Sequence, residues 1–308
     1  MKRYKRMERQ QRRGALGVAA TGVAVALAVS GCGASGGSEP GRGALGSRPA
    51  ASGGATTSEP RAAGPADWRK WGERPLPAAP APPADKPVKL SATGPVPVFM
   101  RIPTSQKVVF ITVDDGLEKD PRFVTMLRDL KIPITMFLMN DVIKSDYGYF
   151  RQLQALGNHV QNHTLHHPVM STLTAARQKE EVCGDQKILT EEYGTAPLLF
   201  RPPYGAYDAA TKAVVGECGP RAIVWWRETM QIRSIDYQLP DKKLHPGDII
   251  LAHFRGPSEL KGATMTQMFA SLLRIIQRQG FAVARLEDYI QPPSRSVHAL
   301  GLPDRHRQ

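Results

Sequence analysis

The sequence predicts an α/β protein built on a parallel sheet or barrel, and two observations support this fold class. From residue 96 onward, short apolar runs typical of buried strands alternate with longer segments whose apolar residues recur at helical spacing. Glycines follow most of the helical segments, as expected for residues that end helices. Alternation of this kind is typical of parallel sheets, whose chemistry gathers at the carboxyl ends of the strands.

The apolar pattern predicts the individual elements. Strands are expected at 108–113, 134–139, 159–163, 198–201, 222–227, 248–254 and 281–285. Helices are expected at 122–130, 147–156, 173–192, 209–217 and 264–279.

The N-terminal part predicts export. Residues 1–13 hold seven Lys or Arg against one Glu, and an apolar stretch of 15 residues, 15–29, follows. It is shorter than the roughly 20 residues that cross a bilayer. It ends in VSGC, which resembles a bacterial lipoprotein signal with Cys32 as the lipidated residue. A plain signal peptide and a short membrane anchor are the alternatives, and the export route stays open.

Composition predicts four segments: a signal at 1–32, a disordered Ala/Pro/Gly-rich linker at 33–95, a folded domain at 96–292 and a flexible tail at 293–308. Within the linker, Trp68 and Trp71 either dock a short turn onto the domain or stay exposed. The net charge is +13, but cleavage at Cys32 would remove the basic arm, so we expect no nucleic-acid partner. We expect a monomer, lipid-anchored on the outer face of the membrane or secreted.

Polar residues stand at the ends of several predicted strands. The first strand ends in Asp114, Asp115 and Gly116, where a simple turn would also account for an Asp-Gly pair. After the third strand, His163 and His167 in HTLHHP are four residues apart, which brings two imidazoles to one side of a turn. Two imidazoles and a carboxylate form a Zn²⁺ ligand set that leaves a position open for water.

Two further strand ends carry polar residues. The fourth strand runs into RPPYG, where the prolines stiffen the turn that holds Arg201 and Tyr204. The sixth predicted strand, GDIILAHF, places His253 near its carboxyl end, where a packed core histidine is the alternative.

The ordered motifs DDG, HTxxHP, RPPYG and LxH together resemble those of the NodB-type polysaccharide deacetylases, carbohydrate esterase family four. The resemblance covers about residues 105–290. It implies a distorted seven-stranded (β/α) barrel, and it implies hydrolysis of acetyl groups on an acetylated polysaccharide with one divalent metal ion, Zn²⁺ or else Co²⁺ or another transition metal.

The resemblance also implies roles for single residues. Asp115, His163 and His167 match the metal ligands, Asp114 the catalytic base, Arg201 the residue that orients this base, and His253 the general acid. The backbone N–H of Tyr204 would help to hold the oxyanion. We expect cell-wall glycan or a chitin-like polymer as substrate, with an O-acetyl esterase acting on xylan and an inactive glycan-binding relative as alternatives.

The fourth motif departs from the family pattern. An Asp near a Trp usually supports the acid histidine, but the matching region reads VWWRETMQ and contains no Asp. We expect either that Glu228 replaces this Asp beside His253, or that Glu228 is solvated and Trp225 or Trp226 lines the sugar groove.

The cysteines leave two outcomes open. If Cys32 is lipidated, Cys183 and Cys218 remain, an even number in an oxidising compartment. They lie on predicted helices that follow consecutive strands, so the two should be neighbours and either form a disulfide or stay as buried thiols.

Overall fold

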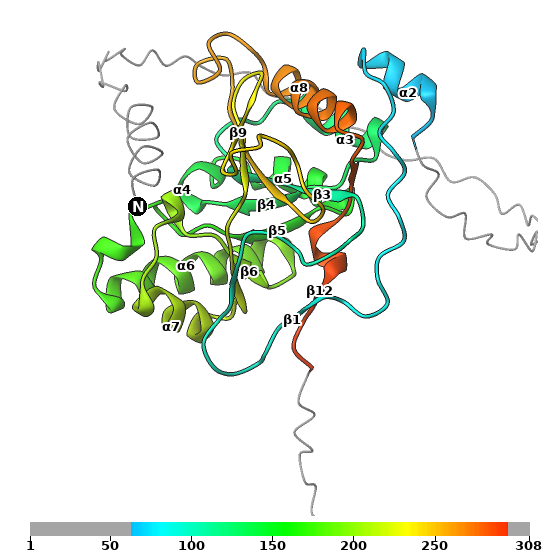
Figure 1. Ribbon diagram of the computed structural model, residues 1–308. Coiled ribbons are helices and arrows are strands. Elements are labelled where there is room, and N and C mark those ends of the chain that lie inside the picture. The colour runs from blue at the N-terminus through cyan, green and yellow to red at the C-terminus, as the bar shows by residue number, and fades with distance from the viewer. Residues whose placement is uncertain (1–62, 295–308) are drawn as a thin grey trace, which may run out of the picture. The chain divides into compact units, whose positions relative to one another are not determined.

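A curled, mostly parallel sheet forms the centre of this computed structural model, which describes residues 63–294 (Figure 1). The seven predicted strands are all present, as β3 (Val108–Asp115), β4 (Thr135–Leu138), β5 (His159–Asn162), β6 (Leu199–Phe200), β7 (Ala222–Val224), β10 (Ile249–His253) and β11 (Ala282–Val283). The order across the sheet is β2-β7-β6-β5-β4-β3-β10-β8-β9, and β11 pairs with β3. The distorted barrel is thus confirmed as a curled sheet.

Five short strands were not predicted: β1 (Val88–Lys89), β2 (Val98–Phe99), β8 (Glu228–Met230), β9 (Ile235–Tyr237) and β12 (Ile290–Gln291). Each has only two or three residues, and none lies in one of the longer apolar runs that indicated the equally short β6, β7 and β11. β8 and β9 form an antiparallel hairpin at one edge of the sheet, and β1 pairs with β12 in a separate two-stranded sheet.

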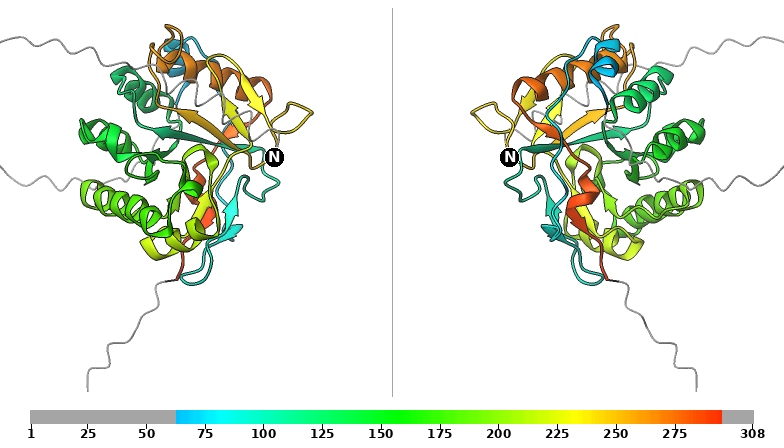
Figure 2. Two further views of the ribbon diagram at one scale, coloured as in Figure 1. Left: turned by 90° about the vertical axis from the view of Figure 1, so that its left-hand side faces the viewer. Right: turned by 90° about the vertical axis from the view of Figure 1, so that its right-hand side faces the viewer.

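The helices surround the outer face of the sheet (Figure 2). They are α2 (Pro65–Lys70), α3 (Pro121–Leu130), α4 (Asn140–Ile143), α5 (Tyr147–Ala155), α6 (Ala175–Tyr193), α7 (Ala209–Cys218) and α8 (Met265–Arg278). The predicted apolar stripe of α8 is buried, and Thr264 and Gln267 form a capping box at its start. α8 and α5 each contact α3, and α6 contacts α7.

The central strand β3 separates two environments. Val109, Ile111 and Val113 belong to the apolar core shared with α3, α5 and α8. Successive strand residues point to opposite faces, so Thr112 and Asp114 face the interior of the curled sheet. Both are nevertheless buried, which requires polar partners inside the barrel.

The predicted linker boundary at residue 95 is wrong for residues 63–95. This segment contains α2 and β1. Trp68 is buried with the main core, which confirms for this residue the alternative that it docks onto the domain. The Lys70 ammonium and the Trp71 indole N–H both donate to Asp129 of α3. A few well-placed anchors therefore order a segment whose composition indicated disorder. The signal, Cys32, the rest of the linker and the tail from residue 295 lie outside the described residues.

Cys183 of α6 and Cys218 at the end of α7 form a disulfide, with their Cα atoms 4.7 Å apart. The structure thus contains the bridge and not the pair of free thiols. Among residues 63–294, no helix is both long enough and apolar enough to cross a membrane.

Candidate active site

The strand register brings the polar strand ends together at one edge of the sheet. Asp114 of β3 lies opposite His253 of β10 and Phe137 of β4. At the same end of β4, on its other edge, Leu138 pairs with Asn162, so His163 follows directly at the end of β5. Three strands, β10, β3 and β5, with β4 between the last two, therefore bring three of the predicted site residues to the same end of the sheet.

A local change of backbone conformation lets the side chains of both Asp114 and Asp115 reach the same group of polar residues. In a regular strand their side chains would point to opposite faces. Asp115 has a φ of 73°, in the left-handed region that few non-glycine residues adopt. Gly116 follows at φ 95°, and a Cβ at this position would lie 2.4 Å from Ile143 Cγ2. The turn therefore redirects the Asp115 side chain, and it packs closely against α4 at Gly116.

Asp115, His163 and His167 form a set that fits a divalent metal ion. Their ligand atoms all lie within 4.8 Å of one another, and each imidazole Nε2 is 3.4 Å from Asp115 Oδ1. Ligands at about 2.1 Å from a tetrahedral ion would be about 3.4 Å apart. Asp115 Oδ1 is buried and has no hydrogen-bond partner, although such an atom normally requires one. A cation between the three side chains would satisfy it.

The electrostatics of the three ligands agree with this fit. Burial alone would raise the pKa of Asp115, but the polar contact with the His163 imidazole and the charges of the nearby histidines lower it below its ordinary value. Burial lowers the pKa of His167 to about 4, which favours the neutral imidazole that a metal needs. Burial also acts to lower the pKa of His163, yet the charges of Asp114 and Asp115 outweigh it and raise this pKa. The two carboxylates therefore favour a positive charge beside them.

Asp114 and Arg201 form a buried ion pair beside the ligand set. Arg201 Nη1 donates to Asp114 Oδ1 and to Thr112 Oγ1, both at 2.7 Å. Arg201 Nε donates to the Val224 carbonyl, and the guanidinium packs over the Phe137 ring. Burial raises the pKa of Asp114, while the charge of Arg201 opposes that shift. The carboxylate is thus fixed in direction and is more basic than an exposed aspartate.

The RPPYG turn supports two of the histidines from the other side. The Arg201 carbonyl lies 2.7 Å from His163 Nδ1, which leaves Nε2 to face Asp115. Tyr204 has a φ of 58°, and its ring lies edge-on to the His167 ring at 4.7 Å between centroids. The stiff turn therefore positions one ligand through a carbonyl and packs against another.

His253 is buried and lies opposite Asp114 at the end of β10. Burial and the charge of Arg255 lower the pKa of His253 well below its ordinary value, and Asp115 is the carboxylate that counteracts this shift. The protonated imidazole would therefore be a strong acid.

The expectation that Glu228 supports His253 is wrong. Glu228 is the first residue of β8 and pairs with Ile250, three residues before His253 on β10. Its buried carboxyl lies near Asp248, and burial together with that second carboxyl raises the pKa of Glu228 to about 9. β8 and β10 lie side by side, as expected. Their register, however, places Glu228 near the start of β10 and not at the end that carries His253. The alternative that it is solvated is also wrong, since it is fully buried.

The two tryptophans have different surroundings. Trp226 is 3% exposed and lies under Arg201, so it cannot line a sugar groove. Trp225 stacks on Trp226, and its indole N–H donates to the Gly205 carbonyl of the RPPYG turn. Trp225 is only partly buried and remains the candidate for sugar contact.

The sequence reasoning missed two carboxylates of α6 that contact the histidine loop. Glu181 Oε2 accepts a hydrogen bond from the His166 N–H, and Asp185 Oδ2 accepts one from the His163 N–H. The missed signal was periodicity: Glu181, Asp185 and Leu189 recur every four residues, which places two acids on the buried stripe of a helix.

Comparison with known proteins agrees with the fold and indicates the family. The family model "Polysaccharide deacetylase" matches residues 101–223. An uncharacterized protein of Streptomyces coelicolor is 39% identical over 195 residues, which span 63% of this chain and 77% of that protein. The peptidoglycan-N-acetylglucosamine deacetylase of Bacillus cereus is 25% identical over 203 residues, 63% of this chain and 93% of that protein.

Solved structures show the same fold. A CE4 family pseudoenzyme from Bacillus anthracis superposes with a TM-score of 0.53 at 18% identity, covering 65% of this chain and 71% of the other. The region that the family model matches includes Asp114, Asp115, His163, His167 and the RPPYG turn. The chain therefore belongs to the NodB-type polysaccharide deacetylase family.

Proposed function

We propose that this protein is a metal-dependent hydrolase that removes N-acetyl groups from a polysaccharide of the cell wall. One observation carries the proposal: an Asp/His/His set, an arginine-bound second carboxylate and a buried histidine lie together at the carboxyl ends of β3, β5 and β10. Each group matches a step that amide hydrolysis requires.

A metal ion would be held by Asp115, His163 and His167. When bound, a divalent ion supplies Lewis-acid polarisation and makes water more acidic. The ligand set of one carboxylate and two imidazoles favours Zn²⁺ or a similar transition metal over Mg²⁺ or Ca²⁺, which prefer oxygen ligands alone.

The protein's own groups would then move the protons. Asp114 is poised to take a proton from the attacking water, because Arg201 fixes its direction and burial raises its pKa. The new C–O bond forms as the carbonyl becomes an oxyanion, which the backbone N–H of Tyr204 would help to stabilise. His253 would protonate the sugar nitrogen as the C–N bond breaks, releasing acetate and a free amine.

The likeness to a peptidoglycan deacetylase supports cell-wall glycan as the substrate class. The expected lipid anchor at Cys32 supports the same choice, since an enzyme on the outer face of the membrane would meet the cell wall. We propose that the protein acts there as a monomer.

Acetate release tests the function. The purified protein from residue 33 onward would be incubated with peptidoglycan, chitin oligomers and acetylated xylan, with and without a chelator. We expect acetate from an N-acetylated glycan, loss of release with chelator, and recovery when Zn²⁺ is added. Release from xylan alone would show an O-acetyl esterase. Glycan binding without any release would show an inactive relative, and release that a chelator leaves unchanged would contradict the metal's role.

A further inference from the structure

The loop that carries both histidine ligands, residues 163–167, has an unusual backbone. Thr164 has a φ of 76° and His167 a φ of 58°, both in the left-handed region. For non-glycine residues this conformation is unfavourable, and it persists only where surrounding contacts fix it. The His167 imidazole can reach Asp115 only while this backbone is held.

Glu181 of α6 holds the middle of this loop. Its Oε2 accepts from the His166 N–H, and its Oε1 lies 2.9 Å from His166 Nδ1. The Glu181 carbonyl also accepts from the Leu165 N–H at 3.2 Å. The Glu181 side chain is 9% exposed, so its two oxygens are largely shielded from water, although the His166 side chain is exposed. One residue thus fixes the two loop positions that separate Thr164 from His167.

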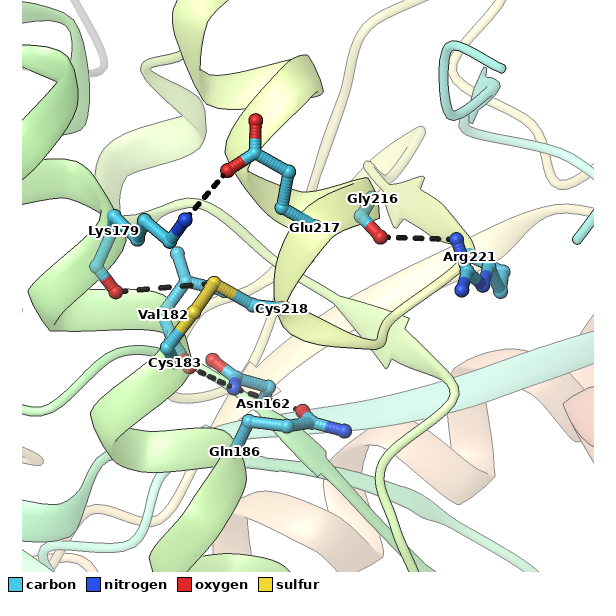
Figure 3. Close-up of a disulfide and its surroundings, with 9 residues drawn as sticks. All are labelled: Asn162, Lys179, Val182, Cys183, Gln186, Gly216, Glu217, Cys218 and Arg221. Carbon is cyan, nitrogen blue, oxygen red and sulfur yellow. Dashed lines mark hydrogen bonds and ion pairs between the residues drawn. A yellow bond between two sulfur atoms is a disulfide. The ribbon is translucent and has the colours of Figure 1, made fainter. Parts of the chain in front are cut away.

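α6 itself is fixed where it meets the loop and β5. Asn162, the last residue of β5, donates to the Val182 carbonyl and to Gln186 Oε1 of α6 (Figure 3). The Cys183–Cys218 disulfide joins this part of α6 to α7 (Figure 3). A Cβ on Gly184 would come within 2.5 Å of Leu165 Cδ1, which shows how closely the helix approaches the loop.

We propose that Glu181 is a positioning residue for the metal site, which holds the strained loop so that His163 and His167 face Asp115 together. The inference rests on the proposed function for its ligand set. Glu181 touches neither the metal ligands' nitrogen atoms nor Asp115, so it acts through the backbone. Outer partners of this kind typically change metal affinity 10- to 100-fold.

The metal affinity of the protein from residue 33 onward, without the expected signal and lipidation residue, is the direct test. Zn²⁺ affinity would be measured by competition with a chromophoric chelator, and the visible spectrum of the Co²⁺-loaded protein would report the ligand geometry. Glu181→Ala should weaken Zn²⁺ binding by about 10- to 100-fold and change the Co²⁺ bands. Glu181→Gln retains an oxygen that can accept from the His166 N–H, so it should bind within about threefold of the wild type and restore the spectrum.

Glu180→Ala is the matched control. Glu180 is the preceding residue of the same helix, is 59% exposed and pairs with Arg177. Its removal should leave both the affinity and the spectrum unchanged. If Glu181→Ala does not fold, His166→Ala removes the imidazole partner from an exposed position and should weaken binding severalfold.

The outcomes separate this inference from the proposed function. A folded Glu181→Ala protein with wild-type affinity and spectrum would overturn the positioning role, as would an unaffected His166→Ala protein where Glu181→Ala is unfolded. The same affinity loss in Glu180→Ala would also overturn it. A wild type that binds Zn²⁺ through the loop but releases no acetate would refute the proposed activity and leave the positioning role intact.

Discussion

Asp114 and Asp115 are neighbours in the chain and have different surroundings. Asp114 faces the barrel interior, where Arg201 binds it. Asp115 is turned by its left-handed backbone toward His163 and His167. The same side-chain type can therefore serve as a proton acceptor at one position and as a metal ligand at the next.

Asp114→Asn tests this division at the level of single residues. Asparagine keeps the shape and can still accept from Arg201, but it cannot take a proton. We expect the Zn²⁺ content to stay near one per chain while acetate release falls by about 100-fold or more. Asp115→Ala is the comparison and should lose both metal and activity. Metal loss in Asp114→Asn, measured by elemental analysis, would contradict the separation of roles.

Gly116 is tested by a pair of glycine substitutions. Both Gly116 and Gly94 have positive φ, at 95° and 83°, but only Gly116 has atoms close to the position of an added Cβ. Gly94→Ala should therefore show the cost of backbone strain alone, about 1 kcal/mol. Gly116→Ala should lower the free energy of unfolding by about 1–3 kcal/mol more, through the clash with Ile143. If urea unfolding showed the same loss of unfolding free energy in Gly116→Ala and Gly94→Ala, α4 would be able to move away from the added methyl group.

At the level of elements, β8 and β10 place two acidic residues in one buried region. Glu228 begins β8, and Asp248 directly precedes β10. Arg101 binds Asp248, and Arg101 and Arg227 partly oppose the raised pKa of Glu228. The pair thus belongs to the packing of the strand starts, distant from the catalytic strand ends.

The raised pKa of Glu228 predicts a pH-dependent stability. The folded protein keeps the Glu228 proton up to about pH 9, whereas the unfolded chain loses it near 4.5. The folded state therefore binds more protons between these values, and its stability should fall as the pH rises through this window. Glu228→Gln removes this titration. Its urea midpoint should therefore rise relative to that of the wild type as the pH increases from 5 to 8.5.

Two results would count against this assignment. Parallel stability curves for the wild type and Glu228→Gln would show that Glu228 does not hold its proton. A shift of the alkaline limb of the pH–rate profile in Glu228→Gln would restore its rejected role beside His253. We expect the two rate profiles to superimpose.

For the whole molecule, the disulfide is the long-range covalent link in the described part of the chain. It joins residues 35 positions apart and connects the helices that follow β5 and β6. In the chain-entropy model a loop of this size contributes roughly 3–4 kcal/mol to the free energy of unfolding. The double variant Cys183→Ser, Cys218→Ser should lose about this amount in denaturant unfolding.

A reducing agent provides the control for the disulfide. It should lower the wild-type unfolding midpoint toward that of the double variant and leave the double variant unchanged. A double variant as stable as the oxidised wild type would show that the packing of α6 on α7 is sufficient without the bond.

The sequence alone determined the order and type of the main elements, because apolar runs of four or more residues and amphipathic helices leave recognisable patterns, even where the strand itself is shorter than the run. It also predicted which residue types end which strands, and their order carried the family resemblance. It overestimated disorder in residues 63–95, because composition averages over the few anchors, such as Trp68, that bury the segment.

The tertiary structure decided everything that depends on register and on contacts between distant segments. Strand order alone placed Glu228 near His253, but the pairing of Glu228 with Ile250 sets it three residues away. The left-handed turn at Asp115 and the support of the histidine loop by Glu181 are equally invisible in a local pattern. These features depend on backbone angles and on contacts between residues far apart in the chain, and only the folded chain fixes both.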